Sequence, residues 1–429
     1  MPRPELADRL ARRMFGLQPH ETGPVALAFA YFFCLLASYY LLRPVRDEMG
    51  IRAGVDDLQW LFTATFLVML ALTPLFGRAS AAWPRARLIP AVYGFFGASL
   101  LLFYLLFLGL PGNPWPARAF YVWISIYNLF VVSVFWSFMT DVFDAAQGKR
   151  LFGLISAGGS LGAIAGPTAA AVLAQQIQTE ALLPTAALVL TGALWAVLRL
   201  SRRIDPRRHP GERLAGGAWE GLRLLTESRQ LQGIALFIWL YTTLSTFLYF
   251  SQAHIVANAY TSSADRTAVF ALIDLAVNGL TLLLQLFVSG RLMQGLGVGP
   301  TLAAVPLLLA GGFALLAFSP IVSIVVAVQV VRRAGNYGIT RPAREVLFTG
   351  VDRASRYKAK NIVDTLVYRG GDALAGWLFA GLKGVGLGLN GIALLAVPLA
   401  LGWSWLGWRL GRALPTRNDQ GGRHASTPD

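Results

Sequence analysis

The chain has 429 residues, of which 55% are hydrophobic and only 14% are charged, and its formal net charge is +15. Soluble globular proteins carry roughly 25% charged residues, so this composition favours an integral membrane protein. The single cysteine, Cys34, excludes an intramolecular disulfide and offers no set of thiolate metal ligands. The lysines and arginines fall mostly in short loops between apolar runs, which explains the basic charge by membrane orientation and not by nucleic-acid binding.

Apolar runs recur along the whole chain, and each is long enough for the ~20 residues of a membrane-spanning helix. The residues before the first run carry arginines and no apolar core, so we interpret that run as an uncleaved helix and not as a signal peptide. We therefore predict an all-α integral membrane protein with about twelve transmembrane helices. The predicted spans are 24–46, 58–76, 88–110, 119–143, 151–174, 181–200, 233–254, 267–289, 301–319, 321–347, 360–383 and 388–410.

The longest connection divides six predicted spans from six others, in a plan that resembles the major facilitator arrangement. Lysine and arginine are concentrated in alternate loops, which predicts that both termini are cytoplasmic. In its second half the connection has apolar residues at helical spacing, typical of an interfacial helix. The predicted parts are a cytoplasmic tail (1–23), an N-terminal half (24–200), a cytoplasmic linker (201–232), a C-terminal half (233–411) and a second cytoplasmic tail (412–429).

Two copies of an Arg-Pro-x-Arg-acid motif close predicted spans one and ten. They are Arg43-Pro44-Val45-Arg46-Asp47 and Arg341-Pro342-Ala343-Arg344-Glu345. Charge at membrane depth is expensive, so such residues are usually functional. Arginine keeps its charge and binds phosphate or carboxylate with a planar fork of donors. The alternative is that these arginines only extend from helix ends to lipid headgroups.

Spacing predicts that each motif continues a polar face inside its helix. Tyr39, Arg43 and Arg46 share one face of span one, and Arg333, Tyr337, Arg341 and Arg344 share one face of span ten. Such a face cannot meet lipid, so we expect both to line a wet cavity between the halves. Because span one runs outward and span ten inward, the two motifs should lie toward opposite membrane surfaces. The predicted substrate-binding residues are Arg46, Arg344, Arg43, Arg341, Arg333, Tyr337 and Tyr40.

Acidic residues near the motifs are candidates for gating or coupling. Asp47 or Glu48 on one side and Glu345 on the other can form charge pairs that open and close. Asp274 lies inside an apolar run without a local partner, which indicates a protonatable or interhelical group. Gly158, Gly162 and Gly166 are spaced by four and predict a close-packing helix face. No metal-ligand spacing, cofactor motif or nucleophile constellation is found, so we predict no cofactor, no metal and no enzymatic activity.

Three stretches resemble the ATP/ADP antiporter family, the nucleotide transporters of intracellular bacteria and plastids, and especially its free-living bacterial members. They are Tyr40–Asp47, Phe135–Gly153 and Arg344–Asp364. The resemblance implies a twelve-helix, facilitator-like fold and nucleotide exchange. It also implies phosphate contacts by Arg46 and Arg344, which stand where the family usually has lysine. The chain departs from the family in residues 122–128, where the family's fourth-helix glutamate is missing.

These observations predict a carrier of the bacterial inner membrane that moves a nucleotide or a similar phosphorylated anion by alternating access and exchange. Its partners would be this anion and the lipid bilayer, with no nucleic acid and with a monomer favoured. Two alternatives stay open. One is a proton-coupled transporter of a non-nucleotide organic anion or drug, and the other is a membrane sensor or scaffold that transports nothing.

Overall fold

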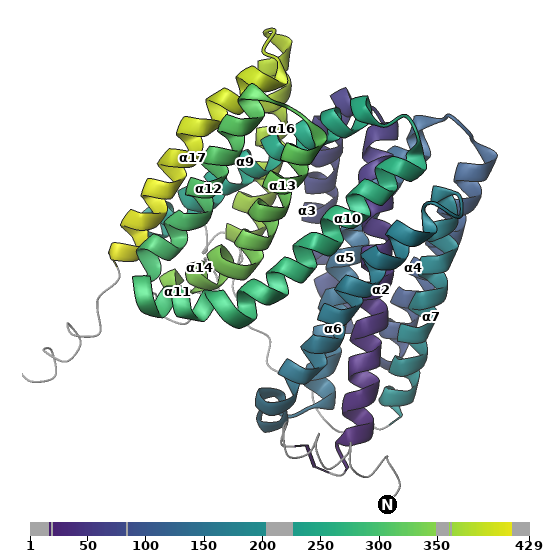
Figure 1. The fold of residues 1–429 in the computed structure, drawn as a ribbon. Helices are drawn as coiled ribbons and strands as arrows, with labels where there is room; N and C mark the ends of the chain where they lie inside the picture. Colours follow the sequence, from purple (N-terminus) through teal and green to yellow (C-terminus); the bar gives the residue numbers. More distant parts are fainter. Residues whose placement is uncertain are drawn as a thin grey trace, which may run out of the picture. The chain divides into compact units, whose positions relative to one another are not determined.

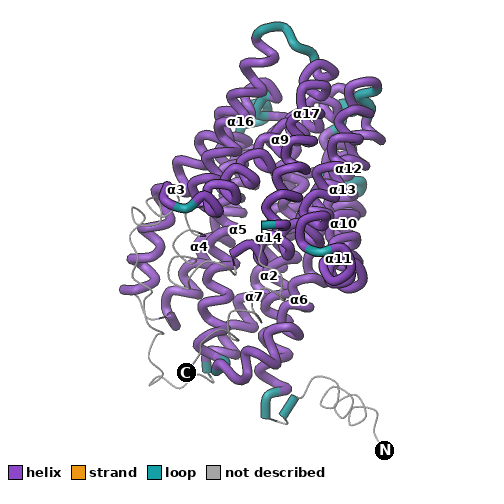
Figure 2. The backbone as a smooth tube through the Cα atoms, turned by 90° about the vertical axis from the view of Figure 1, so that its left-hand side faces the viewer, coloured by secondary structure: helices purple, strands orange, loops and turns teal. Residues whose placement is uncertain are grey.

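The computed structural model describes residues 17–18, 20–82, 85–202, 226–348, 360 and 363–413. Within this part of the chain every regular element is a helix, and the connections are short (Figure 2). The predicted all-α membrane fold is therefore confirmed. Most of the two predicted tails, most of the predicted linker and most of its predicted interfacial helix lie outside the described residues.

The helices follow one another along the chain as Figure 1 labels them. The first group consists of α2 (Thr22–Arg52), α3 (Leu58–Ala82), α4 (Arg85–Gly109), α5 (Pro114–Val142), α6 (Ala145–Leu173) and α7 (Leu182–Ser201). The second consists of α9 (Arg229–Ala259), α10 (Ser263–Leu283), α11 (Ser289–Leu296), α12 (Val298–Phe318), α13 (Val322–Gly335), α14 (Arg341–Leu347), α16 (Tyr368–Gly384) and α17 (Leu389–Arg412).

Ten helical segments among the described residues are long and apolar enough to cross a membrane. They match ten of the predicted spans in order. The described residues of the other two predicted spans, 321–347 and 360–383, are mostly helical and contain π-helical turns, η4 (Asn336–Thr340) and η6 (Val363–Val367). A third π-helical turn, η3 (Leu284–Val288), joins α10 to α11.

Capping residues in the sequence explain where α5 and α6 begin. Asn113 caps the start of α5, where its side chain accepts a hydrogen bond from the Trp115 N–H. Asp144 caps α6 and forms a reciprocal pair with Gln147, in which each side chain accepts from the other's backbone N–H. Such capping boxes satisfy donors that the first helical turn leaves open.

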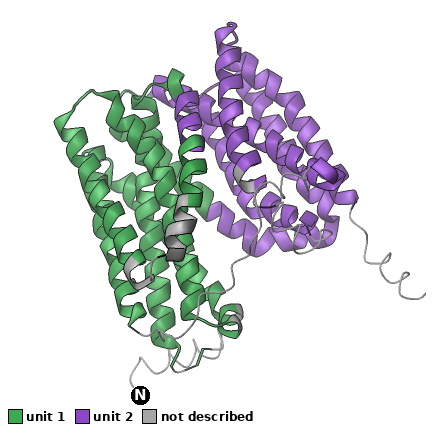
Figure 3. Ribbon diagram, turned by 180° about the vertical axis from the view of Figure 1, so that it is seen from behind, with its two compact units in different colours: residues 1–57, 67–213, 260–278 green, residues 58–66, 214–259, 279–429 purple. Residues whose placement is uncertain are grey.

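The chain forms two compact units, which Figure 3 shows in two colours. Unit 1 consists of Met1–Asp57, Leu67–Arg213 and Tyr260–Asn278, and unit 2 of Leu58–Phe66, Leu214–Ala259 and Gly279–Asp429. Each unit therefore draws on both halves of the sequence. The first part of α10 belongs to unit 1, where the Asn278 Nδ2 donates to the Ala163 carbonyl of α6 at 2.6 Å.

Glycines allow α6 to approach α2 closely within unit 1. A Cβ atom at Gly158, Gly162 or Gly166 would lie only 2.4–2.6 Å from a backbone oxygen of α2. The predicted close-packing face is therefore present, and its partner is α2. Within unit 2, α12 and α17 pack equally closely, because a Cβ at Gly411 would lie 2.3 Å from the Gly299 backbone.

The carboxylate of Glu21 joins the start of α2 to the first turns of α6. It accepts hydrogen bonds from the Arg150 Nη2 at 2.8 Å, the Gln147 Nε2 at 3.0 Å and the Gln18 N–H at 3.0 Å. Burial raises the pKa of Glu21, but the hydrogen bonds and the charge of Arg150 outweigh it and lower the pKa to about 2. Glu21 is thus ionised at any physiological pH.

Candidate functional site

The first motif lies inside α2 and not at its end. The helix continues through Pro44 to Arg52, beyond the predicted end of span one at residue 46. Asp47 and Glu48 are buried, and the side chains of Arg43 and Arg46 are 17% and 19% exposed. The structure thus places two arginines and two acids within the packed part of unit 1.

Each arginine of this motif has both an acidic and an aromatic neighbour. The Arg43 Nη1 donates to the Asp274 Oδ1 of α10 at 2.8 Å, and its guanidinium carbon lies 5.9 Å from the Tyr40 ring centroid. The Arg46 guanidinium lies 4.1 Å from the ring centroid of Tyr121 in α5. Its Nη1 is 3.4 Å from the Asp47 Oδ1. An aromatic face attracts a cation without neutralising its charge.

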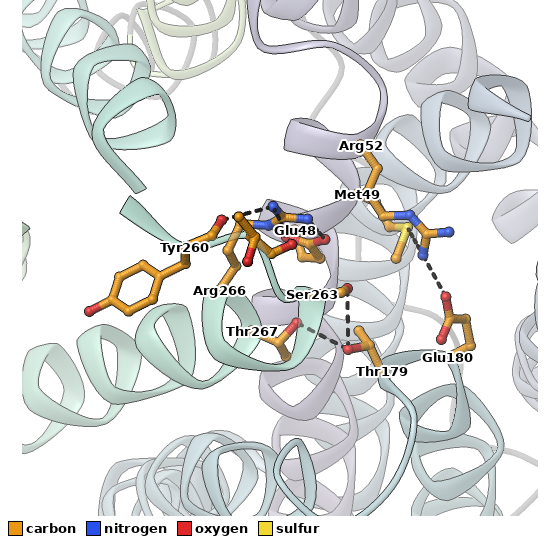
Figure 4. A network of polar contacts seen from close by, with 10 residues as sticks. Glu48, Met49, Arg52, Thr179, Glu180, Tyr260, Ser263, Arg266 and Thr267 are labelled. Atoms are coloured by element: carbon orange, nitrogen blue, oxygen red, sulfur yellow. Dashed lines mark hydrogen bonds and ion pairs between the residues drawn. The ribbon is translucent and has the colours of Figure 1, made fainter. Parts of the chain in front are cut away.

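Glu48 takes part in a polar network that joins α2 to α10 (Figure 4). Its two carboxylate oxygens accept from the Arg266 Nε at 2.6 Å and Nη2 at 2.8 Å, a bidentate pair. The Arg266 Nη1 also donates to the Tyr260 carbonyl at 3.0 Å. Nearby, the Arg52 Nη1 donates to the Glu180 Oε1 at 2.5 Å. Glu48, predicted as a gate, is therefore bound to a specific cation.

Unit 2 contains a second group of buried arginines, on α13 and α14. Arg332 and Arg333 are each 5% exposed and Arg344 is 8% exposed. The Arg332 Nε donates to the Gln329 Oε1 at 2.9 Å, and its Nη1 donates to the hydroxyls of Tyr241 at 3.3 Å and of Ser245. Both hydroxyls come from α9. Arg332 lies outside both motifs and was not among the predicted substrate-binding residues.

The predicted polar face of span ten is not a regular α-helical face. The π-helical turn over Asn336–Thr340 adds a residue to one helical turn, so the spacing of side chains along this stretch differs from that of a regular α-helix. Arg333 and Arg344 are buried and Tyr337 is half-buried, whereas Arg341 is exposed. That the four residues share one face stays a prediction.

Glu345 is paired within unit 2 by two cations. The Lys360 Nζ donates to its Oε2 at 2.6 Å, and the Arg344 Nη2 lies 3.8 Å from its Oε1. The predicted acid of the second motif thus has partners within its own unit. Its role as a gate stays a prediction.

The described residues contain no group of three or more His, Cys, Asp or Glu side chains that could hold a metal ion. What the structure places together instead are guanidinium groups, aromatic faces and hydroxyls inside apolar helices. This chemistry suits the reversible binding of an anion.

Charged groups buried inside apolar helices are rare and usually mark a functional pathway or site. The chain belongs to the Major Facilitator Superfamily, whose sequence profile matches residues 25–349. It is therefore a multi-pass membrane protein of the transporter class, and transporters of this superfamily are generally not enzymes. No curated protein matches the chain.

Solved structures share this fold at low sequence identity. The nucleoside transporter NupG is 12% identical with a TM-score of 0.67, over 92% of this chain and 99% of that one. A bacterial homologue of the human lysosomal transporter Spinster is 14% identical with a TM-score of 0.63, over 92% and 98%. A bacterial homologue of the iron transporter ferroportin is 12% identical with a TM-score of 0.66, over 91% and 100%. The narrower resemblance to ATP/ADP antiporters stays a prediction.

Proposed function

We propose that the protein carries a phosphorylated organic anion, with a nucleotide as the leading substrate, by alternating access and exchange. In this proposal the protein is located in the bacterial inner membrane, both termini are cytoplasmic, and the functional unit is a monomer. The transporter fold supports carriage of a small molecule, and the buried arginines supply the selectivity for an anion.

One observation carries the proposal: each unit buries arginines inside its helices and holds them with aromatic rings and hydroxyls as well as with acids. In unit 1, Arg46 lies over the Tyr121 ring. In unit 2, Arg332 lies among the hydroxyls of Tyr241 and Ser245. Guanidinium groups form bidentate hydrogen bonds with phosphate, and they keep their charge at any physiological pH. We assign substrate contacts to Arg46 of unit 1 and Arg344 of unit 2. Arg43 in unit 1 and Arg333 in unit 2 are further candidates for substrate contacts.

Asp274 favours a second candidate, a proton-coupled transporter of another organic anion. This carboxylate is 1% exposed and is paired with Arg43. A buried acid that exchanges a proton for its arginine partner would couple transport to a pH gradient. Uptake that needs an imposed pH gradient, and that stops in Asp274→Asn, would favour this candidate over exchange.

A ligand screen by thermal shift on the purified protein tests the leading proposal. A ligand that binds only the folded state stabilises it by mass action, by about 2.7 kcal/mol at a hundred times its Kd. We expect nucleotides to raise the melting temperature, and non-phosphorylated carboxylates and nucleosides to leave it unchanged. No shift with any nucleotide at millimolar concentration would contradict the proposal.

A further inference from the structure

Arg332 is a deeply buried cation that belongs to neither Arg-Pro-x-Arg-acid motif. Its position in α13 brings it against α9, where Tyr241 and Ser245 accept hydrogen bonds from its Nη1. Its own helix supplies the third acceptor, the side-chain amide oxygen of Gln329. The Tyr241 ring centroid also lies 6.0 Å from the guanidinium carbon. All of these partners are neutral.

A buried cation with neutral partners is costly unless something else compensates its charge. Removing a charged group from water costs several kcal/mol, and packed proteins usually offset it with an acid. Neutral acceptors satisfy donors but leave the positive potential in place. They occupy three of the five guanidinium N–H donors, and the two on Nη2 receive no acceptor among the described residues.

Among the described residues, charged groups of both signs lie near this arginine. Tyr241 contacts Tyr368 of α16 with ring centroids 5.9 Å apart, and both tyrosines feel the charge of Asp372. Asp372 accepts a hydrogen bond from the Thr246 hydroxyl at 3.4 Å. Arg369 lies 5.8 Å from the Tyr368 ring centroid. Near these two tyrosines, the described residues thus place Arg332 and Arg369 beside Asp372.

We propose that Arg332, Tyr241 and Ser245 form an oxyanion subsite that binds a phosphoryl group of the substrate; this deepens the proposed function and rests on it. The free Nη2 edge of the guanidinium donates to two oxygens of the tetrahedral group. The two hydroxyls keep the guanidinium in place, and each still has its own hydrogen to donate to the anion. The subsite lies within unit 2, on α9 and α13.

The test uses the full chain in dodecyl maltoside without added phospholipid, so that lipid phosphate cannot occupy the subsite. Thermal shifts are titrated with pyrophosphate and, separately, with succinate. The variants are Arg332→Gln and Arg332→Lys, with Arg409→Gln as control, because Arg409 is an exposed arginine stacked near Trp405. If Arg332→Gln fails to fold, Tyr241→Phe and Ser245→Ala test the same subsite with its charge kept.

We expect Arg332→Gln to weaken pyrophosphate binding about tenfold or more, the equivalent of one charge-assisted hydrogen bond. Arg332→Lys should keep part of the affinity, Arg409→Gln all of it, and each hydroxyl variant should lose a few-fold. The melting temperature of Arg332→Gln without ligand should not fall, because a buried charge is removed. Unchanged pyrophosphate affinity in Arg332→Gln, with or without a lower melting temperature, would overturn the inference.

The two proposals fail in different ways. If pyrophosphate binds the wild type independently of Arg332, the phosphorylated substrate class stands and the subsite is wrong. If only succinate binds, and its binding depends on Arg332, the subsite is an oxyanion site and the phosphorylated class is wrong. If neither compound shifts the melting temperature of the wild type, both proposals are overturned.

Discussion

Glu48 and Arg266 are two charges buried inside unit 1 that bind each other through both carboxylate oxygens. Glu48 is 0% exposed and the Arg266 side chain is 13% exposed. A pair of this kind contributes little compared with a well-packed apolar pair, but loss of one member strands the other charge away from water. Substitution of only one of the two residues should therefore destabilise the protein, because the other is left as a buried, unpaired charge.

We predict that Glu48→Gln destabilises the protein by about 3–5 kcal/mol, the usual cost of an uncompensated buried charge. The matched control is Asp57→Asn, which breaks a pair of similar length, 2.6 Å to Arg118, whose side chains are 46% and 29% exposed. An exposed pair of this kind contributes about 0–1 kcal/mol. Chemical denaturation in detergent measures both. Equal losses in the two variants would show that burial does not govern the Glu48 pair.

The carboxyl group of Glu21 should make the stability of the folded protein depend on pH. Its pKa is about 2 in the folded protein, against an ordinary value of 4.5. A carboxyl group with a depressed pKa stabilises the fold above its ordinary pKa, and this stability is lost as the pH falls toward the folded value. We predict a loss of about 1–3 kcal/mol between pH 4.5 and pH 2 that is missing in Glu21→Gln. Melting curves of both proteins at pH 7 and pH 3 check this, and a parallel decline would contradict it.

Some residues of the candidate site could be predicted from the sequence, but their interaction partners could not. The two motifs were visible because arginine and proline are rare inside apolar runs. The partners of Glu48 and Asp274 were not, since Arg266 and Arg43 lie more than 200 positions away from them. Arg332 was not predicted because its partners, Tyr241 and Ser245, lie on a different helix, α9. Neither partner belongs to a recognisable sequence motif.

At the scale of the elements, the pairing of α6 with α2 depends on glycine. The Gly162 position would place a Cβ atom 2.4 Å from the Phe33 carbonyl oxygen and 2.9 Å from the Ala37 nitrogen. Backbone atoms cannot move aside as a flexible side chain can. The two helices would have to separate, and unit 1 would lose packing along their length.

We therefore predict that Gly162→Ala lowers stability by about 1–3 kcal/mol, the usual cost of overpacking. Gly153→Ala on the same helix is the control, because a Cβ there meets nothing within 4 Å. Gly153→Ala should be neutral or slightly stabilising, because alanine is about 1 kcal/mol more favourable than glycine inside a helix. Thermal unfolding in detergent compares them. A Gly162→Ala protein as stable as Gly153→Ala would refute the close approach.

Hydropathy located the helices well but not their ends or their irregular turns. The apolar run of span one weakens at Arg43, yet α2 continues to Arg52 because its charged residues find partners on α5 and α10. The π-helical turns are invisible to periodicity, which assumes one residue spacing throughout. One such turn, at Asn336–Thr340, interrupts the regular spacing on which the predicted face of span ten was based.

At the scale of the whole molecule, composition and the spacing of apolar runs were sufficient to predict the class. The superfamily match over residues 25–349 and the solved transporter folds agree with that prediction. The substrate is a different matter, because a shared fold serves many cargoes. It depends on a few side chains, and for these the buried arginines of each unit are the strongest guide.

The most direct test of the central claim is substrate uptake by proteoliposomes loaded with unlabelled nucleotide. We predict that the wild type exchanges external labelled nucleotide, and that Arg46→Ala and Arg344→Ala each lower kcat/KM by about tenfold or more. Arg409→Ala, an exposed control, should retain wild-type uptake. Normal uptake by both the Arg46→Ala and the Arg344→Ala proteins, or no exchange of any phosphorylated compound by the wild type, would contradict the proposed nucleotide exchange.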